Sequence, residues 1–261
     1  MSENLRRRKS VFNKVPSLTH DSISLRGAGV VYVTQPKSGH RFTLDSILLA
    51  DFCMLKSRDR VLEPGAGSGI ISLLLANKFP HAHITAVELQ PAIAGIAREN
   101  ISNNALDDRI QLIESDIAAL KKVLPANTFD VIIANPPYAR PGAGKSSPLA
   151  ARRTAREDRL GPVDAWLDLR MFLKNRGRYC LVFPAARSAE LTASLRTGKL
   201  EPKRVRFVHS YQGKPASLVL IEAVKSGGTG VAVLPPLIVH ERGGGYTREM
   251  QEIYGEKRVQ T

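Results

Sequence analysis

The sequence has few cysteine and aromatic residues. Among its 261 residues there are two cysteines and one tryptophan, and aromatic residues make up 6%. Cys53 and Cys180 lie in apolar segments, and neither belongs to a C-x-x-C pair or to a Cys/His cluster with metal-ligand spacing. We therefore expect no structural metal site. Two buried thiols indicate a reducing compartment, so we expect a cytoplasmic protein.

Long apolar runs are also absent. No stretch of about 18 apolar residues occurs, which is the minimum for a helix that crosses a membrane. The first ten residues, MSENLRRRKS, lack the apolar core of a secretory signal peptide. We therefore expect no contact with a membrane. Nothing in the sequence fixes the oligomeric state, and a monomer is only slightly favoured.

Acidic residues are scarce relative to basic ones. The chain has 38 Lys and Arg against 24 Asp and Glu, which gives a net charge of +14 and an isoelectric point near 10.1. Solubility alone is usually served by a net charge of about 2–8 in small domains. The excess therefore predicts a polyanionic partner, and nucleic acid is the commonest one.

Most of this excess lies between residues 140 and 214, which hold 17 Lys and Arg against 6 Asp and Glu. A second basic run lies near the start of the chain. As a set, such side chains predict a track for RNA phosphates. The predicted RNA-binding residues are Arg6, Arg7, Arg8, Arg140, Lys145, Arg152, Arg153 and Arg156.

Hydrophobic residues make up 43% of the chain and alternate in strand-like and helix-like patterns from residue 42 onward. Strands are predicted at 59–64, 83–89, 109–115, 128–137, 176–184, 202–210 and 217–224, and helices at 44–55, 70–79, 91–104, 163–174 and 186–197. Strands separated by helices predict an α/β fold with a mostly parallel sheet. The short connection between the last two strands favours an antiparallel pair at one edge. Residues 1–41 form a basic N-terminal extension with a short strand at 30–34, and 42–261 form the main domain.

A glycine-rich segment follows the first of the regular strands. It reads Glu63-Pro64-Gly65-Ala66-Gly67-Ser68-Gly69 and opens the next helix, where glycines permit a tight turn and close approach of a ligand. Its spacing differs from the dinucleotide pattern G-x-G-x-x-G, and it has no Gly-Lys-Ser/Thr for phosphates. Two further carboxylates, Glu88 and Asp116, follow the next two strands. Three acidic residues around one glycine loop suit a ligand with an amino group, a ribose and an adenine.

The strand at 128–137 leads into Asn135-Pro136-Pro137-Tyr138. The two prolines fix the backbone where the strand leaves the sheet. The Asn135 side-chain oxygen and the Pro136 carbonyl can each accept a hydrogen bond from a substrate nitrogen whose lone pair is delocalised. Tyr138 can stack on a flat substrate group. Positioning and electrostatics then supply the catalysis without a strong base.

These motifs, in this order, resemble class I S-adenosylmethionine-dependent methyltransferases. Across most of its length, from Arg41 to Thr247, the chain is similar to bacterial tRNA (adenine-N6)-methyltransferases that modify adenosine 37 of a valine tRNA. The resemblance implies a Rossmann-like, mostly parallel seven-stranded sheet with helices on both faces. It also implies S-adenosyl-L-methionine as the cofactor and catalysis by Asn135, Pro136, Pro137 and Tyr138. The implied cofactor-binding residues are Asp45, Glu63, Gly65, Gly67, Ser68, Gly69, Glu88, Leu89, Asp116, Ile117 and Asn135.

Within that resemblance, Glu63 lies near the methionine amine, Glu88 on the ribose, and Leu89, Asp116 and Ile117 around the adenine. The Asn-Pro-Pro-Tyr motif also occurs in enzymes that methylate glutamine N5 of release factors or guanine N2 of ribosomal RNA, so these remain alternatives. A non-enzymatic RNA-binding protein with this fold is a further alternative. The chain lacks a helical substrate domain before residue 59 and a second glycine loop, which favours tRNA.

Overall fold

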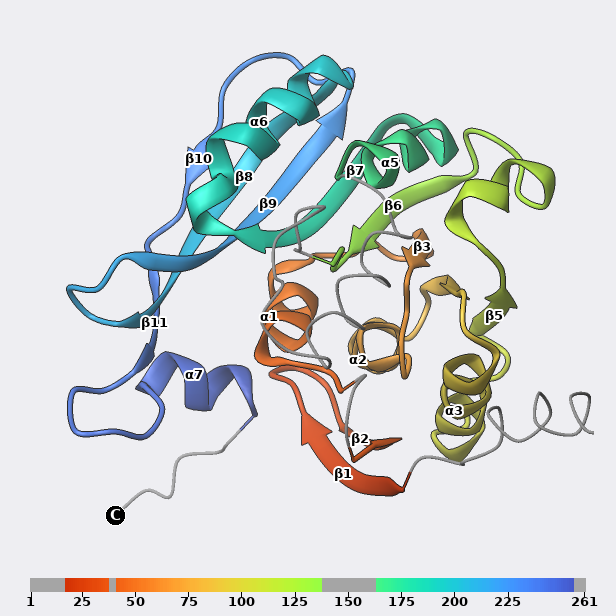
Figure 1. The fold of residues 1–261 in the computed structure, drawn as a ribbon, viewed down its shortest axis with the longest axis horizontal. Helices are drawn as coiled ribbons and strands as arrows, with labels where there is room; N and C mark the ends of the chain where they lie inside the picture. Colours follow the sequence, from red (N-terminus) through yellow and green to blue (C-terminus); the bar gives the residue numbers. More distant parts are fainter. Residues whose placement is uncertain (1–16, 38–40, 138–162, 256–261) are drawn as a thin grey trace, which may run out of the picture.

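The computed structural model describes residues 17–37, 41–137 and 163–255 (Figure 1). Within these residues nine strands form one sheet, in the order β10-β8-β9-β7-β6-β3-β4-β5, with β11 also paired to β8. Its strands are β3 (Arg60–Pro64), β4 (His83–Glu88), β5 (Ile110–Glu114), β6 (Phe129–Ala134), β7 (Leu173–Pro184), β8 (Leu200–Tyr211), β9 (Ala216–Lys225), β10 (Ala232–Val233) and β11 (Leu237–His240). The seven predicted strands are thus present, and two short ones are added along β8.

All pairings in this sheet are parallel except those of β9, which runs antiparallel to both β7 and β8. This confirms the predicted antiparallel pair at one edge. Because the other strands share one direction, their carboxyl ends lie along the same edge of the sheet. Ligands of open α/β sheets bind beyond that edge.

Helices cover both faces of the sheet, as predicted (Figure 1). They are α1 (Leu44–Phe52), α2 (Ile70–Lys78), α3 (Pro91–Asn103), α5 (Val163–Leu167), α6 (Ser188–Thr197) and α7 (Arg248–Ile253), with 3-10 turns η1 (Ile117–Lys122), η3 (Asp168–Phe172) and η4 (Ala185–Arg187). Neighbouring strand residues alternate between two cores. Val61 packs with α1 and α2, whereas Leu62 packs with α5 and α6.

One predicted helix is shorter than expected. The periodicity predicts helix over 163–174, but α5 ends at Leu167, η3 ends at Phe172, and β7 begins at Leu173 rather than at residue 176. The backbone N–H groups of Asn127 and Thr128 donate to the carbonyls of Met171 and Phe172. Leu173 then pairs with Phe129 of β6. Pairing with the sheet therefore replaces the last helical turn.

An antiparallel hairpin, β1 (Leu18–Ser24) and β2 (Val30–Pro36), precedes α1. This confirms the strand predicted at 30–34. Its residues Ile23, Val31 and Val33 are buried in the same core as α1 and α2. The boundary predicted between 41 and 42 remains a prediction, but the hairpin shares its apolar core with the domain that follows.

Asparagine side chains fasten β2 to α3. Asn104 accepts from the N–H of Tyr32 and donates to its carbonyl, at 2.9 and 2.7 Å, and Asn100 does the same for Thr34, at 2.7 and 2.8 Å. The spacing explains the match, since four residues of helix rise about 6 Å and two residues of strand about 6.6 Å. The open edge of β2 is thus bonded by side chains in place of a third strand.

Candidate active site

The glycine loop connects β3 to α2 in a backbone shape that favours glycine. Gly65, Gly67 and Gly69 have φ of +68°, +59° and +85°, in the left-handed region. A Cβ on Gly65 would lie 2.7 Å from the Trp166 ring of α5, so this glycine is packed against the protein. Among the described residues, none has an atom within 4 Å of a Cβ on Gly67. No described residue therefore covers the loop backbone at Gly67.

Glu88, the last residue of β4, lies against this loop. One carboxylate oxygen accepts from the N–H of Gly67 at 3.0 Å. The other accepts from the backbone and side-chain nitrogens of Gln90, at 2.9 and 3.3 Å. The side chain is buried, with 6% of the residue exposed. The structure thus brings together the glycine loop and the second acidic residue that the sequence singled out.

Glu63 is held on the inner side of the loop. One of its oxygens accepts from the N–H of Ser72 at 2.9 Å and from the Ser72 hydroxyl. Burial raises the pKa of Glu63 to about 8, although the bonds from Ser72 act in the opposite direction. At neutral pH much of this carboxyl is therefore protonated. Glu63 is part of the support of α2 as well as a neighbour of the loop.

The residues predicted to surround the adenine follow β4 and β5, which lie one and two strands away from β3 in the sheet. Leu89 follows β4 and is 38% exposed, and Ile117, after β5, is partly buried. Asp116 is exposed and caps η1, since one of its oxygens accepts from the N–H of Ala118 at 2.9 Å. Together they present apolar side chains and one carboxylate beside the glycine loop.

Asn135 follows β6 directly, and β6 lies next to β3 in the sheet. Its side-chain nitrogen donates to the hydroxyl of Ser46 at 3.2 Å. The amide nitrogen is turned toward α1, so the amide oxygen points away from Ser46. Pro136 is buried and Pro137 half-buried. Tyr138, the fourth residue of the motif, lies outside the described residues.

The segment around Asp45 lies beside this motif. Thr43 precedes α1 with the extended backbone of an N-cap, though its side chain makes no capping bond. Asp45 is half-buried in the first turn, and Ser46 beside it contacts Asn135. The backbone N–H of Phe42 donates to Gln35 of β2 at 3.2 Å. The hairpin, α1 and the motif are therefore connected.

Sequence reasoning missed three residues at this site. Besides Ser46 and Trp166, it missed Asn100 of α3, which donates to the carbonyl of Ser68 at 2.9 Å as well as to that of Thr34. Asn100 is buried on the apolar face that also carries Ala97. A lone amide on an apolar helix face is a signal that could have identified it.

The eight predicted RNA-binding residues all lie outside the described ranges, so their role remains a prediction: Arg6, Arg7, Arg8, Arg140, Lys145, Arg152, Arg153 and Arg156. Within the described ranges, no helix is long and apolar enough to cross a bilayer. No group of three or more His, Cys, Asp or Glu side chains in these ranges is arranged to hold a metal ion.

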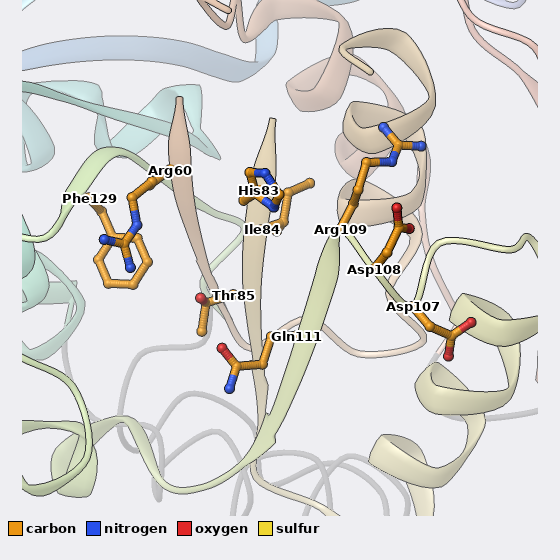
Figure 2. Close-up of a pocket in the computed structure, with 9 residues that line it drawn as sticks. All are labelled: Arg60, His83, Ile84, Thr85, Asp107, Asp108, Arg109, Gln111 and Phe129. Carbon is orange, nitrogen blue, oxygen red and sulfur yellow. The ribbon is translucent and has the colours of Figure 1, made fainter. Parts of the chain in front are cut away.

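A pocket of about 310 Å³ lies at the opposite, amino-terminal edge of the same strands (Figure 2). Figure 2 shows Arg60 and Phe129 on one side, and Asp108 and Arg109 on the other. Arg60 begins β3, whereas the glycine loop follows its end, about 16 Å away along five strand residues. The residues suited to chemistry lie at the carboxyl edge, so we place the candidate site there rather than in this pocket.

The sheet order, with one antiparallel strand beside the outermost long one, and a glycine loop after β3 define the Rossmann-like fold of class I methyltransferases. A crystal structure of a predicted O-methyltransferase from Agrobacterium tumefaciens has this fold. It superposes with a TM-score of 0.66 at 23% identity, covering 81% of this chain and 96% of that one. Residues 38–153 match the methyltransferase small domain.

Sequence similarity to two proteins of Haemophilus influenzae identifies the family within this class. Both are named tRNA1(Val) (adenine(37)-N6)-methyltransferase. The one from strain 86-028NP is 33% identical over 165 residues, which are 62% of this chain and 69% of the relative. The one from strain PittEE is 35% identical over 155 residues, which are 59% of this chain and 65% of the relative's length. The chain belongs to this family of methyltransferases.

Proposed function

We propose that this chain transfers a methyl group from S-adenosyl-L-methionine to N6 of an adenine in tRNA, with adenosine 37 of a valine tRNA as the target. The observation that carries the proposal is the place of Asn135. It follows β6, next to the glycine loop of β3, and its amide is oriented by Ser46. The family to which the chain belongs, and its net charge of +14, support tRNA as the substrate.

The residues at the carboxyl edge fit this cofactor. Glu63, Glu88 and Asp116 form no ion pair with the described residues. Carboxylates without cationic partners suit a ligand that carries an ammonium, a sulfonium and ribose hydroxyls, and they disfavour phosphates. No described residue blocks the approach of such a ligand to the loop backbone at Gly67. The bound cofactor supplies an electrophilic methyl group.

In this proposal Glu88 accepts the ribose hydroxyls, while Gly65, Gly67, Ser68 and Gly69 surround the methionine part. Leu89 and Ile117 contact the two faces of the adenine ring, and Asp116 accepts from its amino group. Asp45 covers the site from α1. Glu63 stays beside the methionine amine through the oxygen that Ser72 does not occupy.

Asn135 and Pro136 act on the substrate. The amine of adenine is a poor nucleophile because its lone pair is delocalised into the ring. The Asn135 amide oxygen and the Pro136 carbonyl each accept one N–H of this amine, which holds the nitrogen toward the methyl group and favours a tetrahedral geometry. Pro137 fixes the turn, and Tyr138 stacks on the base. Methylation acidifies the nitrogen, so water can take its proton.

Adenine has to leave its stack to reach Asn135, which needs least energy in a single-stranded loop such as the anticodon loop. We place this activity in the cytoplasm, consistent with two buried, unoxidised thiols, Cys53 and Cys180. A monomer suffices for the proposed site, since every residue in it comes from one chain.

The test uses three incubations of the full chain with isotope-labelled cofactor. One contains tRNA, one ribosomal RNA and one a release factor. Nucleosides and peptides from each are then analysed by mass spectrometry. We expect N6-methyladenosine in tRNA. Label in glutamine of the release factor or in guanine of ribosomal RNA, with none in tRNA, would replace this proposal by the corresponding alternative.

A further inference from the structure

Four aromatic rings near the end of the chain form a continuous stack, which we call the aromatic ladder. Its successive rings are Tyr211, His240, Tyr246 and Tyr254, with centroids 5.3, 5.3 and 5.2 Å apart. The contacts of Tyr246 with His240 and with Tyr254 are nearly parallel, at 13° and 24° between ring planes, and that of Tyr211 with His240 is tilted by 34°. Such rings are uncommon in a chain with 6% aromatic residues, so their alignment calls for an explanation.

The ladder lies at the same edge of the sheet as Asn135. Tyr211 and His240 are partners at the carboxyl ends of β8 and β11. Two antiparallel pairings, β7 with β9 and β9 with β8, give β8 the direction of β6. Three strand-to-strand steps and six residues of β8 separate Tyr211 from the end of β6, about 25 Å in an untwisted sheet. Figure 1 shows the β8–β9 turn, β11 and α7 on one flank of the molecule.

Tyr211 is the open end of the ladder. It is 41% exposed, and among the described residues the only aromatic ring in contact with it is that of His240. Tyr246 is also exposed at its rim, but both of its faces are covered, by His240 and by Tyr254. Tyr211 is therefore the exposed end of the ladder, since Tyr254 at the other end packs against the apolar core.

The charges near this ring are mostly positive, although the exposed Glu241 follows His240 directly. Lys214 is in the same turn, its N–H bonds to the Tyr211 carbonyl, and its ammonium forms no ion pair with the described residues. Arg242, in the turn between β11 and α7, is likewise exposed. The acidic residues of α7 are paired, Glu249 with Arg206 and Glu252 with Arg248. An exposed aromatic ring in the same turn as an unpaired cation is suited to a nucleotide, whose base stacks while its phosphate meets the cation.

We propose that Tyr211 is a stacking platform for an unpaired base of the RNA substrate, with Lys214 on the phosphate of that nucleotide. The separation of about 25 Å from the end of β6 means that this base is a different one from the methylated adenine. His240, Tyr246 and Tyr254 hold the platform rigid. This inference rests on the proposed function, because it takes tRNA as the bound polyanion.

The experiment measures binding of a fluorescently labelled, unmodified valine tRNA transcript to the full chain by anisotropy. Tyr211→Ala is expected to weaken binding about fivefold to 160-fold, the range of one base–aromatic stack. Tyr211→Phe and Tyr211→Trp should retain wild-type affinity, and Tyr211→Leu should not, because only a π face stacks. Tyr32→Ala is the matched control, since Tyr32 is 63% exposed on the hairpin and outside the ladder. The melting temperature of each variant is measured alongside.

Salt dependence separates the two contacts. The slope of log affinity against log salt should be unchanged in Tyr211→Ala and shallower by about one in Lys214→Gln, because only a phosphate contact releases counterions. Wild-type affinity in a folded Tyr211→Ala chain would overturn the inference, as would equal losses in Tyr211→Ala and Tyr211→Phe. Methylation of the same tRNA by the wild type is measured in parallel. Binding without methylation would overturn the proposed function alone, and absence of binding would overturn both.

Discussion

The two edges of the central sheet differ in whether their least exposed carboxylates have a cationic partner. At the amino-terminal edge these carboxylates are paired: Asp130 bonds to Lys174 at 2.7 Å, and Arg178 bonds to Asp59 at 2.7 Å. Although burial acts the other way, the bonds from Lys174 and from the N–H of Arg60 lower the pKa of Asp130. At the carboxyl edge, Glu63 and Glu88 have no cationic partner among the described residues.

This difference separates structure from function. A paired charge near the surface contributes a little to stability and needs no ligand. A buried carboxylate without a cation is unfavourable for folding alone, so a protein retains one where a ligand supplies the missing charge or donors. The described residues that line the pocket of about 310 Å³ at the amino-terminal edge include no buried carboxylate. The buried carboxylates without a cationic partner among the described residues, Glu63 and Glu88, lie at the carboxyl edge. Variants matched between the two edges test this comparison.

The largest effect is expected at Asn135. Asn135→Ala should lower the rate of methyl transfer to tRNA by about 10²–10³-fold, because loss of one preorganised partner acts mainly in the transition state. Cofactor affinity should stay nearly unchanged. Single-turnover methylation and calorimetry of cofactor binding measure the two effects.

The control for Asn135 is Gln111→Ala, which removes an amide from the pocket at the amino-terminal edge. We expect wild-type rates for this variant. If both variants were as active as the wild type, the Asn-Pro-Pro motif would be only a turn. If both lost activity, the pocket would belong to the reaction.

The second effect concerns the cofactor. Glu88→Ala should weaken binding of S-adenosylmethionine by about 1.5–3 kcal/mol, the range for hydrogen bonds to a charged group. Asp108→Ala, which removes a carboxylate from the opposite edge, should leave the affinity as it is. Isothermal titration calorimetry measures the cofactor affinity of both variants. Unchanged affinity in Glu88→Ala would remove this carboxylate from the cofactor site.

The third effect is a pH dependence of stability. The pKa of Glu63 rises from 4.5 to about 8 on folding, so between these values the folded chain holds a proton that the unfolded chain has released. The contribution of Glu63 to the free energy of unfolding therefore falls as pH rises from about 4.5 to 8. Glu63→Gln should flatten this dependence in urea unfolding at pH 5.5 to 8.5. Parallel pH profiles for wild type and variant would contradict the raised pKa.

Much of the carboxyl edge could be predicted from sequence because its determinants are local. The glycines of the loop require left-handed φ, and Glu88 and Asn135 follow apolar strands whose ends are evident from periodicity. Parallel strands bring such ends to one edge of a sheet. The amino-acid pattern alone therefore suffices to place the glycine loop and Glu88 together.

Other features depend on contacts between distant segments. The clash of a Gly65 side chain with Trp166 joins residues 101 positions apart, and the bond between Asn135 and Ser46 spans 89. The early start of β7 at Leu173 depends on its pairing with Phe129, which overrides helical periodicity. Neither composition nor spacing contains these contacts, so the sequence could not predict them.

The smallest effect tests such a contact. Ser46→Ala removes the hydroxyl that accepts from the Asn135 amide at 3.2 Å. One hydrogen bond contributes about 0.5–1.5 kcal/mol, so we expect a twofold to tenfold loss in kcat. KM for tRNA should stay constant, because the bond orients Asn135 and does not hold the RNA.

A matched control for Ser46 is Ser102→Ala, which removes a serine hydroxyl bonded at 2.6 Å to Asp107, a residue that lines the pocket at the amino-terminal edge. It should leave kcat unchanged. The double variant Ser46→Ala with Asn135→Ala gives the decisive result. If Ser46 acts only through Asn135, the double variant should be no slower than Asn135→Ala alone. Additive losses would show that Ser46 contributes by another route, and that the amide of Asn135 is oriented without it.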